Sequence, residues 1–283
     1  MSDSTTSGFG LAGVMGWPVA QSRSPIMHNY WLEKYKINGR YVPLPVAPGG
    51  VTDAVRGMRA LGFRGCNVTM PHKQSVIPLL DRIDDTAKRM GAINCIVINP
   101  DGSMSGTNND GNGYFYSLLD TAPGFKADAG PIALLGAGGA ARAVLVALIE
   151  RGAREIRLIN RTFERAEQIA AELGGPIKAY PWERRSDLIG DVALLANATN
   201  QGMTGKPALD ISLDRLPQQT LVSDLIYVPP ETPFLKAAKA RGNVTVNGLG
   251  MLLHQGRPAF KAWFGVMPDV TPELRATIEA TFK

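Results

Sequence analysis

The sequence predicts an α/β protein with mostly parallel sheet, organised as two domains of moderate size. Strand-like and helix-like segments alternate from residue 11 onward, which is typical of βαβ units. After a loop at residues 121–131 the alternation begins again, which indicates a second group of such units. A length of 283 residues with 45% hydrophobic content supplies enough apolar side chains for two buried cores.

The first half is expected to run strand, helix, strand, helix, strand. Apolar runs and helical spacing place these elements, in order, at residues 11–16, 24–37, 40–46, 51–62 and 65–70. Residues 91–107 contain two more strands, joined by a turn at Asn99-Pro100-Asp101-Gly102, because these residue types favour turns. This hairpin ends the first half, and a polar, glycine-bearing stretch leads into a helix at residues 114–119.

The second half begins with a strand, a glycine turn and a helix over residues 131–152. A strand and a helix over residues 154–174 complete the βαβ unit. Further strands are expected at residues 191–199, 220–227 and 243–248. Apolar spacing predicts that residues 251–265 and 272–282 are helical.

Composition excludes several classes of function. No segment approaches the roughly 18 consecutive apolar residues of a membrane helix. The N-terminus has neither the basic start nor the apolar core of a signal peptide, so we expect a short disordered lead-in and a cytoplasmic protein. The net charge is +5, but basic and acidic residues are interspersed, which favours anionic small-molecule ligands over nucleic acid.

Neither a disulfide nor a metal site is expected. Cys66 and Cys95 lie in separate apolar strands, outside any C-x-x-C pattern, which indicates buried free thiols in a reducing compartment. The three histidines form no ligand set with a cluster of carboxylates. We interpret them as packing or cleft-wall residues, namely His28, His72 and His254.

The segment that starts at residue 131 carries a dinucleotide-binding signature. The apolar run PIALL ends in Gly136-Ala137-Gly138-Gly139-Ala140-Ala141, and a strong helical pattern follows directly. The first glycine permits a tight turn, and the next lets the backbone approach a pyrophosphate at the helix N-terminus. A small residue such as Ala141 suffices for helix packing at the position of a third glycine. The sequence therefore predicts a nucleotide site in a Rossmann-type domain.

The next strand indicates which nucleotide binds. An NAD-dependent protein usually ends this strand with an acidic residue, which bonds the ribose 2′-hydroxyl. Here the strand ends in Asn160-Arg161-Thr162, and Arg165 follows one helical turn later. Two guanidinium groups and a hydroxyl suit a 2′-phosphate, which predicts NADP(H). The alternative is that Arg165 forms a surface ion pair with an acid of its own helix, namely Glu164, Glu167 or Glu172.

A second candidate site precedes the first predicted helix. Ser24 is expected to cap this helix, with Pro25 at its first position. Ser22 and Ser24 also place two hydroxyls beside a helix N-terminus, which suits a carboxylate. Capping alone would explain the serines, but a hydroxyl can accept from the backbone and donate to a ligand, so both roles are compatible.

Eight short motifs follow one another along nearly the whole chain beyond its first ten residues. They are G-x-P-x-x-x-S-x-S-P at 16–25, N-V-T-x-P-x-K at 67–73, G-A-x-N at 91–94, N-D-G at 109–111, the GAGGA loop, N-R-T at 160–162, N-A-T at 197–199, and G-L-G-M-L at 248–252 with Gln255. In this order they resemble the shikimate dehydrogenase family. Three positions depart from the family pattern without removing a catalytic group: Gln21 for a frequent His, Asn109 for Thr and Asn247 for Asp.

The resemblance implies a domain organisation and an activity. Residues 1–110 would form an N-terminal α/β catalytic domain that the C-terminal helices at 248–283 complete, with a Rossmann domain at 111–247 inserted between them. The activity would be the NADP-dependent interconversion of shikimate, a cyclic hydroxy acid, and its ketone 3-dehydroshikimate. We expect a monomer or a homodimer.

The resemblance also assigns roles to individual residues. The catalytic pair would be Lys73 and Asp110. The substrate carboxylate would be held by Ser22, Ser24 and Tyr227. The substrate hydroxyls would be contacted by Thr69, Asn94, Asp110 and Gln255. The cofactor would also contact Ala198, Thr199, Gly248 and Met251.

The chemistry of hydride transfer supports the catalytic pair. Reduction of a ketone develops negative charge on its oxygen, so a proton donor must lie within hydrogen-bond reach. A lysine beside an aspartate keeps its proton, because an opposite charge favours the charged form. Lys73 and Asp110 follow apolar strands, and α/β active sites lie beyond the carboxyl ends of strands, which favours a catalytic role over two surface charges.

The substrate preference and the catalytic role have alternatives. Ser24 stands where some quinate-using relatives have Thr, which favours shikimate over the bulkier quinate. A quinate/shikimate dehydrogenase of broader range is the alternative enzyme. A sensor that binds NADP without turnover is the alternative from another class of function.

Overall fold

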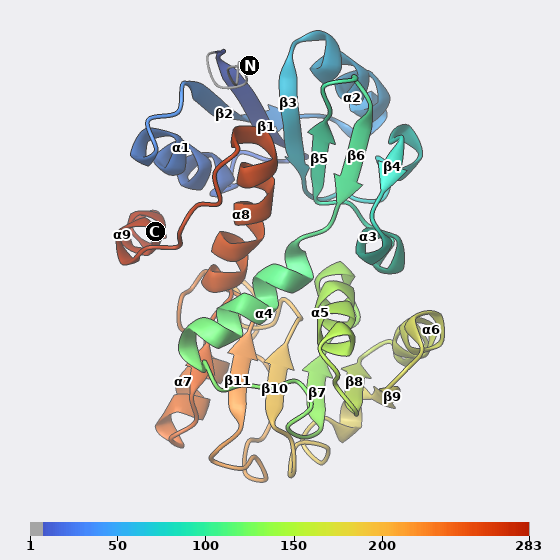
Figure 1. Ribbon diagram of the computed structural model, residues 1–283. Helices are drawn as coiled ribbons and strands as arrows, with labels where there is room; N and C mark the ends of the chain where they lie inside the picture. Colours follow the sequence, from blue (N-terminus) through green and yellow to red (C-terminus); the bar gives the residue numbers. More distant parts are fainter. Residues whose placement is uncertain (1–7, 283) are drawn as a thin grey trace. The chain divides into compact units, whose positions relative to one another are not determined.

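The computed structural model describes residues 8–282, which form two compact units (Figure 1). The first unit comprises residues up to 109 together with 255–281, and the second comprises 110–254 together with Phe282. Most of the expected N-terminal lead-in, residues 1–7, lies outside the described part of the chain. Within residues 8–282, no helix has the length and apolar character needed to cross a membrane.

The first unit is built on a six-stranded sheet with the order β2-β1-β3-β5-β6-β4. Its strands are β1 (Gly10–Gly16), β2 (Gly39–Pro45), β3 (Phe63–Val68), β4 (Arg82–Ile83), β5 (Cys95–Ile98) and β6 (Met104–Thr107). The pairs β1–β2, β1–β3 and β4–β6 are parallel, whereas β5 is antiparallel to both β3 and β6. The predicted hairpin is confirmed, and its turn closes where Gly102 N–H donates to the Asn99 carbonyl over 2.8 Å.

Among residues 8–282, five α-helical segments belong to the first unit. They are α1 (Ser24–Lys34), α2 (Val51–Ala60), α3 (Asp85–Met90), α9 (Pro272–Glu279) and the part of α8 (Leu249–Phe264) that begins at residue 255. In α2, for example, Val51, Val55 and Met58 are buried and pack against Cys66 and Ile96 of the sheet. The sequence did not predict β4 and α3, which are too short for a clear period.

Helix α1 differs in two details from its prediction. It ends at Lys34 rather than residue 37, and Lys36 beyond it takes a positive φ of 53°. Ser24 does not cap the helix: the N-cap residue of α1 is Arg23, and its side chain makes no capping hydrogen bond. Pro25 does stand in the first turn, as expected. The capping prediction was wrong by one residue because a Ser-Pro pair also suits the first turn itself.

Strand β2 is an edge of the sheet, but its outer backbone groups are largely blocked. Asn29 of α1 accepts a hydrogen bond from Tyr41 N–H over 3.0 Å and donates one to the Tyr41 carbonyl over 2.8 Å. Tyr41 therefore directs its backbone groups away from β1, and Pro43 and Pro45 share this orientation because it alternates along a strand. Proline has no N–H, so this edge offers few donors to a further strand.

The second unit contains a fully parallel sheet with the order β12-β11-β10-β7-β8-β9 (Figure 1). Its strands are β7 (Ile132–Leu135), β8 (Ile156–Asn160), β9 (Ile177–Pro181), β10 (Leu194–Asn197), β11 (Leu221–Asp224) and β12 (Thr245–Val246). Numbered within the unit, this is the order 6-5-4-1-2-3 of a Rossmann sheet. The predicted Rossmann fold is confirmed.

Alternate residues of these strands fill two cores on opposite faces of the sheet. Ile132 and Leu134 of β7 contribute to one core, and Ala133 and Leu135 contribute to the other. The helices of this unit are α4 (Asp110–Thr121), α5 (Gly139–Glu150), α6 (Phe163–Leu173), α7 (Pro233–Ala240) and the start of α8. The sequence did not predict β9 or α7.

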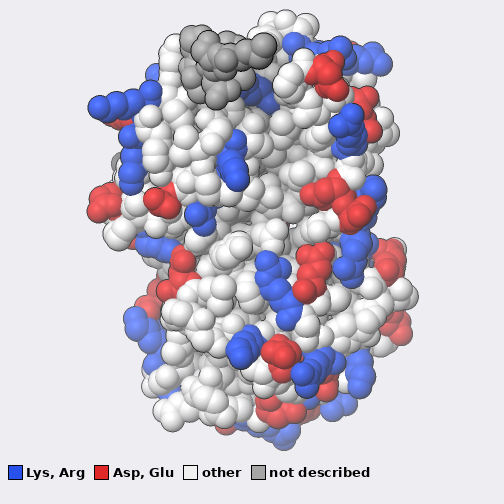
Figure 2. Space-filling view, in the orientation of Figure 1, with Lys and Arg blue, Asp and Glu red and all other residues white. Residues whose placement is uncertain are grey.

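The surface and the cysteines agree with the composition. Lys and Arg side chains are interspersed with Asp and Glu on the face shown in Figure 2. Both cysteines are free and buried, as expected. Cys66 is opposite Ile96, and Cys95 is opposite Asn67, so the two thiols point to opposite faces of the sheet. Burial raises the pKa of both thiols, that of Cys95 to about 12, so neither is a reactive thiolate at neutral pH.

Gly65 of β3 should be irreplaceable, because the indole of Trp263 passes over it and donates to the Ile96 carbonyl over 3.0 Å. A Cβ at Gly65, where φ is 147°, would lie 2.0 Å from that carbonyl oxygen and 2.4 Å from the indole nitrogen. We expect Gly65→Ala to lower the free energy of unfolding by about 3 kcal/mol or more. Urea denaturation measures the change.

Gly57 in α2 provides the matched control. A Cβ there would meet no atom within 4 Å. Gly57→Ala should therefore raise the free energy of unfolding by about 0.5–1 kcal/mol, because alanine is the better helix former. Equal effects of the two substitutions would contradict the packing described for Gly65.

Candidate functional site

The predicted nucleotide loop follows β7, at the point where the strand order of the second unit reverses. Neighbouring strands on the two sides of β7 are β8 and β10, and ligands of open α/β sheets bind beyond the carboxyl ends at such a point. Gly136 has a φ of 103°, and a Cβ there would lie 3.0 Å from the Ala198 carbonyl oxygen. The glycine loop and the loop that contains Ala198 and Thr199 therefore lie side by side.

The glycines that follow leave room for a ligand. A Cβ at Gly138 or Gly139 would meet no atom within 4 Å, so open space lies beside this part of the backbone. Helix α5 begins at Gly139, and no side chain caps its N-terminus. Its first N–H groups can therefore donate to an anion, which fits the pyrophosphate of a dinucleotide. Ala137 is buried beneath the loop, and Ala140 is exposed in the first turn.

The predicted 2′-phosphate site lies at the end of β8. Asn160 donates to the Thr162 carbonyl over 2.7 Å, which shapes the turn into α6. Arg161 and Arg165 are exposed, and neither forms an ion pair within residues 8–282. Glu172, one of the three acids considered as surface partners for Arg165, instead accepts hydrogen bonds from two other side chains, Arg142 and Gln168. The two guanidinium groups thus remain exposed beside the nucleotide loop.

A buried carboxyl group supports the loops next to this site. Asp224 ends β11 and accepts hydrogen bonds from Asn197 over 3.1 Å and from Thr232 over 2.7 Å. It also accepts from Ile226 N–H over 3.1 Å, directly before Tyr227. Burial raises the pKa of Asp224 to about 6, although these hydrogen bonds oppose the rise. Asp224 thus connects the ends of β10 and β11 to the start of α7.

The start of α8 packs against the same loop. A Cβ at Gly248 would lie 1.9 Å from the Leu225 carbonyl oxygen, so only glycine fits there. Asn247 accepts from Leu249 N–H over 3.1 Å and donates to the Pro230 carbonyl over 2.9 Å. This residue, an Asp in the family pattern, therefore still bonds the first N–H of α8. Met251 packs against the core of this unit.

The two serines of the predicted carboxylate site are held by the start of α1. The Ser22 hydroxyl accepts from Ser24 N–H over 3.3 Å, and Ser24 is buried. Because Ser24 does not cap the helix, its hydroxyl is not committed to the backbone of the first turn. Gln21 is exposed and donates to the Pro18 carbonyl over 3.2 Å.

The loop after β3 positions Thr69 and Lys73. Thr69 N–H donates to the Met15 carbonyl over 2.9 Å, which fixes the loop to β1. His72 is buried, and its Nε2 lies 2.6 Å from the Val46 carbonyl oxygen, which fixes the loop to the end of β2. Ile93 N–H donates to the Lys73 carbonyl over 2.8 Å, so half-buried Lys73 lies next to the segment that carries Asn94.

Asn94 is the centre of a buried network of amide groups. Its Oδ1 accepts from Asn109 N–H over 2.9 Å, and its Nδ2 donates to Gln255 Oε1 over 3.3 Å. Its carbonyl accepts from Asn67 Nδ2 over 3.0 Å. Asn109, a Thr in the family pattern, bonds Asn94 through its backbone, so the replacement leaves this bond intact. The structure therefore brings together Asn94 and Gln255, two residues predicted to contact substrate.

The predicted site residues divide between the two units. The first unit contains Ser22, Ser24, Thr69, Lys73, Asn94 and Gln255. The second unit contains Asp110, the first residue of α4, and half-buried Tyr227, together with the predicted cofactor residues. Within each unit, the hydrogen bonds described above hold the loops that carry these residues.

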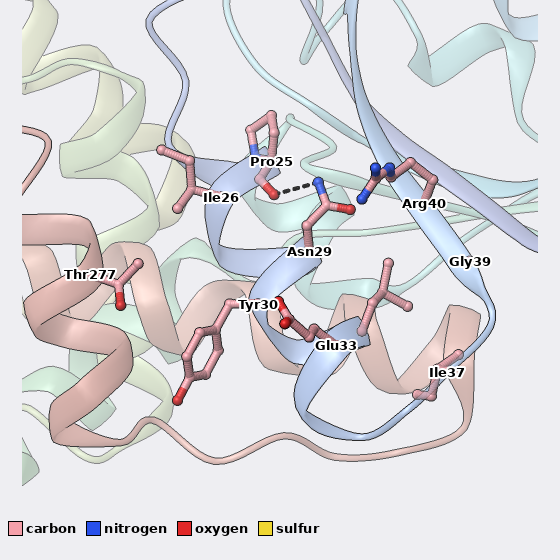
Figure 3. A pocket seen from close by; sticks show the side chains of 10 residues that line it. Pro25, Ile26, Asn29, Tyr30, Glu33, Ile37, Gly39, Arg40 and Thr277 are labelled. Carbon is pink, nitrogen blue, oxygen red and sulfur yellow. Dashed lines mark hydrogen bonds between the residues drawn. The ribbon is translucent and has the colours of Figure 1, made fainter.

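A separate pocket of about 570 Å³ lies on the first unit between α1, β2 and α9 (Figure 3). Asn29, Tyr30, Glu33, Arg40 and Thr277 line it, and Asn29 also donates to the Pro25 carbonyl over 2.7 Å. None of the residues predicted to contact substrate or cofactor lines this pocket. Its polar groups include the Asn29 amide that already bonds Tyr41.

All three histidines are buried, and His28 and His72 lie in packed surroundings. His28 is fully buried, and burial lowers its pKa to about 3. His254 is buried too, and its Nε2 lies 2.7 Å from Asp120 Oδ2. Among residues 8–282, no group of three or more His, Cys, Asp or Glu side chains is arranged to hold a metal ion.

Comparisons with known proteins agree with this geometry. Three family models match: shikimate dehydrogenase substrate binding domain at residues 14–96, shikimate / quinate 5-dehydrogenase at 124–230, and shikimate 5'-dehydrogenase C-terminal domain at 248–275. The shikimate dehydrogenase (NADP(+)) of Paramagnetospirillum magneticum is 49% identical over 268 residues, which cover 95% of this chain and 97% of that protein. This chain belongs to the shikimate dehydrogenase family.

Solved structures support the same assignment. The quinate dehydrogenase from Corynebacterium glutamicum, in complex with NAD, has a TM-score of 0.89 at 30% identity and covers 96% of this chain and 100% of its own. The shikimate dehydrogenase from Thermus thermophilus, in complex with NADP(H) and shikimate, has a TM-score of 0.82 at 35% identity and covers 96% of this chain and 97% of its own. The predicted family is confirmed.

Sequence reasoning did not single out several residues that support the site of this shikimate dehydrogenase family member. Asn67 holds the Asn94 carbonyl, and Asp224 holds the loops around the nucleotide site. The sequence contained a signal for Asp224, because an acid at the end of an apolar strand is rarely buried without a role. Tyr41, whose hydroxyl donates to Asn67, carried no such signal, since a tyrosine in a strand is ordinary.

The raised pKa of Asp224 predicts a specific dependence of stability on pH. The folded-state pKa is about 6 and the ordinary value is 3.8, so between these values the folded chain binds more protons than the unfolded chain. The free energy of unfolding should therefore fall by up to about 3 kcal/mol as the pH rises from about 4 to about 6. Asp224→Asn should flatten this part of the profile, measured by urea denaturation at each pH.

Asp191 provides the matched control. A hydrogen bond from Arg157 lowers the pKa of Asp191, so its stabilising contribution is present at neutral pH and is lost in acid. In the wild type, Asp191 therefore makes the free energy of unfolding rise with pH in acid, whereas Asp224 makes it fall. Asp191→Asn should remove that rise. Parallel profiles for wild type and Asp224→Asn would contradict the buried state of Asp224.

Proposed function

We propose that this chain is an NADP(H)-dependent shikimate dehydrogenase that reversibly reduces 3-dehydroshikimate to shikimate. The observation that carries the proposal is the nucleotide loop of the second unit. Open space lies beside its Gly138 and Gly139, and two exposed arginines, Arg161 and Arg165, lie after the next strand. The comparisons support both ligands, because relatives at 45–49% identity bear the name shikimate dehydrogenase (NADP(+)). The free, buried thiols support a reducing compartment such as the cytoplasm.

The cofactor half of the proposal assigns each part of the nucleotide to a feature of the second unit. The residues of the glycine loop would hold the pyrophosphate at the N-terminus of α5. Arg161 and Arg165 would bond the 2′-phosphate, with Asn160 and Thr162 shaping the turn between them. Ala198, Thr199, Gly248 and Met251 would line the rest of the cofactor site, because they lie beyond β10 and at the start of α8.

The substrate half of the proposal rests on the first unit. Ser22 and Ser24 would hold the carboxylate with Tyr227, and the amides of Asn94 and Gln255 would bond ring hydroxyls with Thr69. Polar groups positioned by a rigid network discriminate hydroxyl patterns strongly, because a missing partner leaves a buried group unpaired. The amide network around Asn94 has this character.

We assign proton transfer to Lys73, with Asp110 as its partner. When bound, NADPH supplies the hydride. The Lys73 ammonium would then donate a proton to the ketone oxygen as negative charge develops there, and would accept it back in the reverse direction. The bond from Ile93 N–H to the Lys73 carbonyl supports this role, because it holds Lys73 next to Asn94.

The alternative enzyme is a quinate/shikimate dehydrogenase of broader range. One relative with a TM-score of 0.89 is a quinate dehydrogenase in complex with NAD, so the fold itself does not select shikimate. Two features of this chain favour shikimate and NADP: the serine at position 24, and the absence of an acid at the end of β8.

The oligomeric state is a separate question. The blocked backbone groups at the edge strand β2 disfavour a dimer formed by strand addition at that edge.

The substrate and cofactor assignments predict one preferred pair. Among shikimate and quinate, each with NADP or NAD, kcat/KM should be highest for shikimate with NADP, measured by steady-state kinetics. Arg161→Ala should reduce this preference by raising KM for NADP about tenfold, while KM for NAD stays unchanged. A higher kcat/KM for quinate or NAD would contradict the assignment, and no turnover of either acid would favour the sensor.

Lys73→Ala tests the proton donor. We expect kcat to fall by about 10²–10⁴-fold, because general acid catalysis is lost, while KM for shikimate changes little. Lys88→Ala is the matched control, since Lys88 is exposed and pairs with exposed Asp85. Turnover near the wild-type rate in Lys73→Ala would show that another group transfers the proton.

A further inference from the structure

Tyr41 of β2 lies inside the first unit, well away from its surface. Its side chain is 1% exposed, and its backbone is held by Asn29 on both N–H and C=O. The His28 ring stacks on the phenol ring with a centroid distance of 4.1 Å and an interplanar angle of 4°. Trp263 packs beside it at 5.9 Å. These neighbouring rings and the fixed backbone hold the phenol in place.

The hydroxyl of Tyr41 points at an amide of the site network. It donates to Asn67 Oδ1 over 2.7 Å, and both residues are buried. The Ser24 side chain also lies at hydrogen-bonding range of this hydroxyl. Burial raises the pKa of the Tyr41 phenol well above its ordinary value, so the phenol keeps its proton and acts as a donor. Burial also keeps the His28 ring neutral at physiological pH, so no charge competes for the Asn67 oxygen.

The Asn67 amide is held at both ends, by the Tyr41 hydroxyl and by the Asn94 carbonyl. With Oδ1 directed at the phenol, Nδ2 faces the Asn94 carbonyl and donates to it over 3.0 Å. A flipped amide would turn its oxygen toward the Asn94 carbonyl and lose that bond, because two acceptors cannot bond each other, whereas the Tyr41 hydroxyl can either donate or accept. The same carbonyl accepts from Val68 N–H over 2.9 Å, so Asn94 is held between two donors of β3.

The side chain of Asn94 has an equally defined orientation. Asn109 N–H occupies its oxygen and Gln255 accepts from its nitrogen, so the donor side of Asn94 faces Gln255. The chain of bonds runs from Tyr41 through Asn67 to Asn94 and Gln255, and every member is at most 9% exposed. In a network of this kind, removing one donor leaves an unpaired buried oxygen and frees the groups beyond it.

We propose that Tyr41 is a positioning residue for the substrate, which orients Asn67 and thereby holds Asn94 in the geometry that binds the ring hydroxyls. This inference rests on the proposed function, in which Asn94 contacts those hydroxyls. Tyr41 itself acts through the network and transfers no proton. Its loss weakens recognition of the hydroxyls and leaves the hydride-transfer chemistry and the nucleotide site unchanged.

Tyr41→Phe removes the hydroxyl and keeps the ring. We expect KM for shikimate to rise about tenfold, as for one lost hydrogen bond, while kcat stays within about twofold and KM for NADP is unchanged. A second measurement uses cyclohexene-1-carboxylate, which has the carboxylate without the ring hydroxyls, as a competitive inhibitor. Its inhibition constant should change much less than KM for shikimate, because Tyr41→Phe keeps Ser22 and Ser24 in place and removes only the contact between the phenol and the Ser24 side chain.

Tyr30→Phe is the matched control, because Tyr30 lies in the same unit and its hydroxyl bonds Thr271 at 3.3 Å. Its KM for shikimate should be that of the wild type. In the Asn67→Ala background, Tyr41→Phe should add nothing further to KM, because the connecting amide is already gone. Asn67→Ala alone should raise KM for shikimate, and it replaces Tyr41→Phe as the test if the latter does not fold.

The outcomes separate the inference from the proposed function. Wild-type turnover of shikimate is measured first, and its absence would overturn the proposed function itself. With an active wild type, an unchanged KM for shikimate in Tyr41→Phe would overturn the positioning role, whatever the melting temperature. A parallel loss of kcat, shikimate binding, inhibitor binding and NADP binding would overturn it too, because that pattern indicates general disruption.

Discussion

The loops of the first unit that carry the predicted substrate residues depend on one hydrogen bond, from the Asn67 amide to the Asn94 carbonyl. This bond joins the end of β3, which carries the loop to Lys73, to the residue that precedes β5. An amide that is buried must have both ends satisfied, and Tyr41 and Asn94 satisfy the two ends of Asn67. The position of Asn94, which is predicted to bind the ring hydroxyls, therefore depends on the packing of Asn67 and Tyr41.

A buried carboxyl has the corresponding role in the second unit. Asp224 accepts from a side chain of β10, from the residue before Tyr227 and from the N-cap of α7. The cost of burying an acid is offset by these three donors, and the raised pKa of Asp224 shows that the offset is incomplete. Both units thus use a buried polar group to order loops at the carboxyl ends of strands, where ligands of α/β proteins bind.

Much of the fold could be predicted from the sequence, because the signals were local. Apolar runs bounded by turn residues located the long strands, and the glycine loop between β7 and α5 identified the Rossmann unit. Among the elements that were not predicted, β4 and α3 are only two and six residues long, too short for a period. Their positions depend on tertiary contacts, such as β4 pairing with β6.

The candidate site could be predicted only where motifs name the residues. Ser22, Lys73 and Asn94 belong to short ordered motifs. Tyr41 belongs to none, and it becomes a partner of Asn67, the first residue of the motif at 67–73, only through β-sheet packing across 26 positions. The error at Ser24 has the same origin, because a serine before proline suits both the N-cap and the first turn. Which of these it adopts is decided by its buried surroundings rather than by the local sequence.

The insertion of Trp263 over Gly65 has a consequence for biosynthesis. The indole that covers β3 and β5 lies near the end of α8, about 200 residues after the strand that it contacts. The second unit, apart from Phe282, is one continuous segment and has all its strands before α8 emerges. On a ribosome, therefore, the nucleotide-binding unit can fold as it emerges, while the core of the unit begun first stays uncovered until α8 has been synthesised.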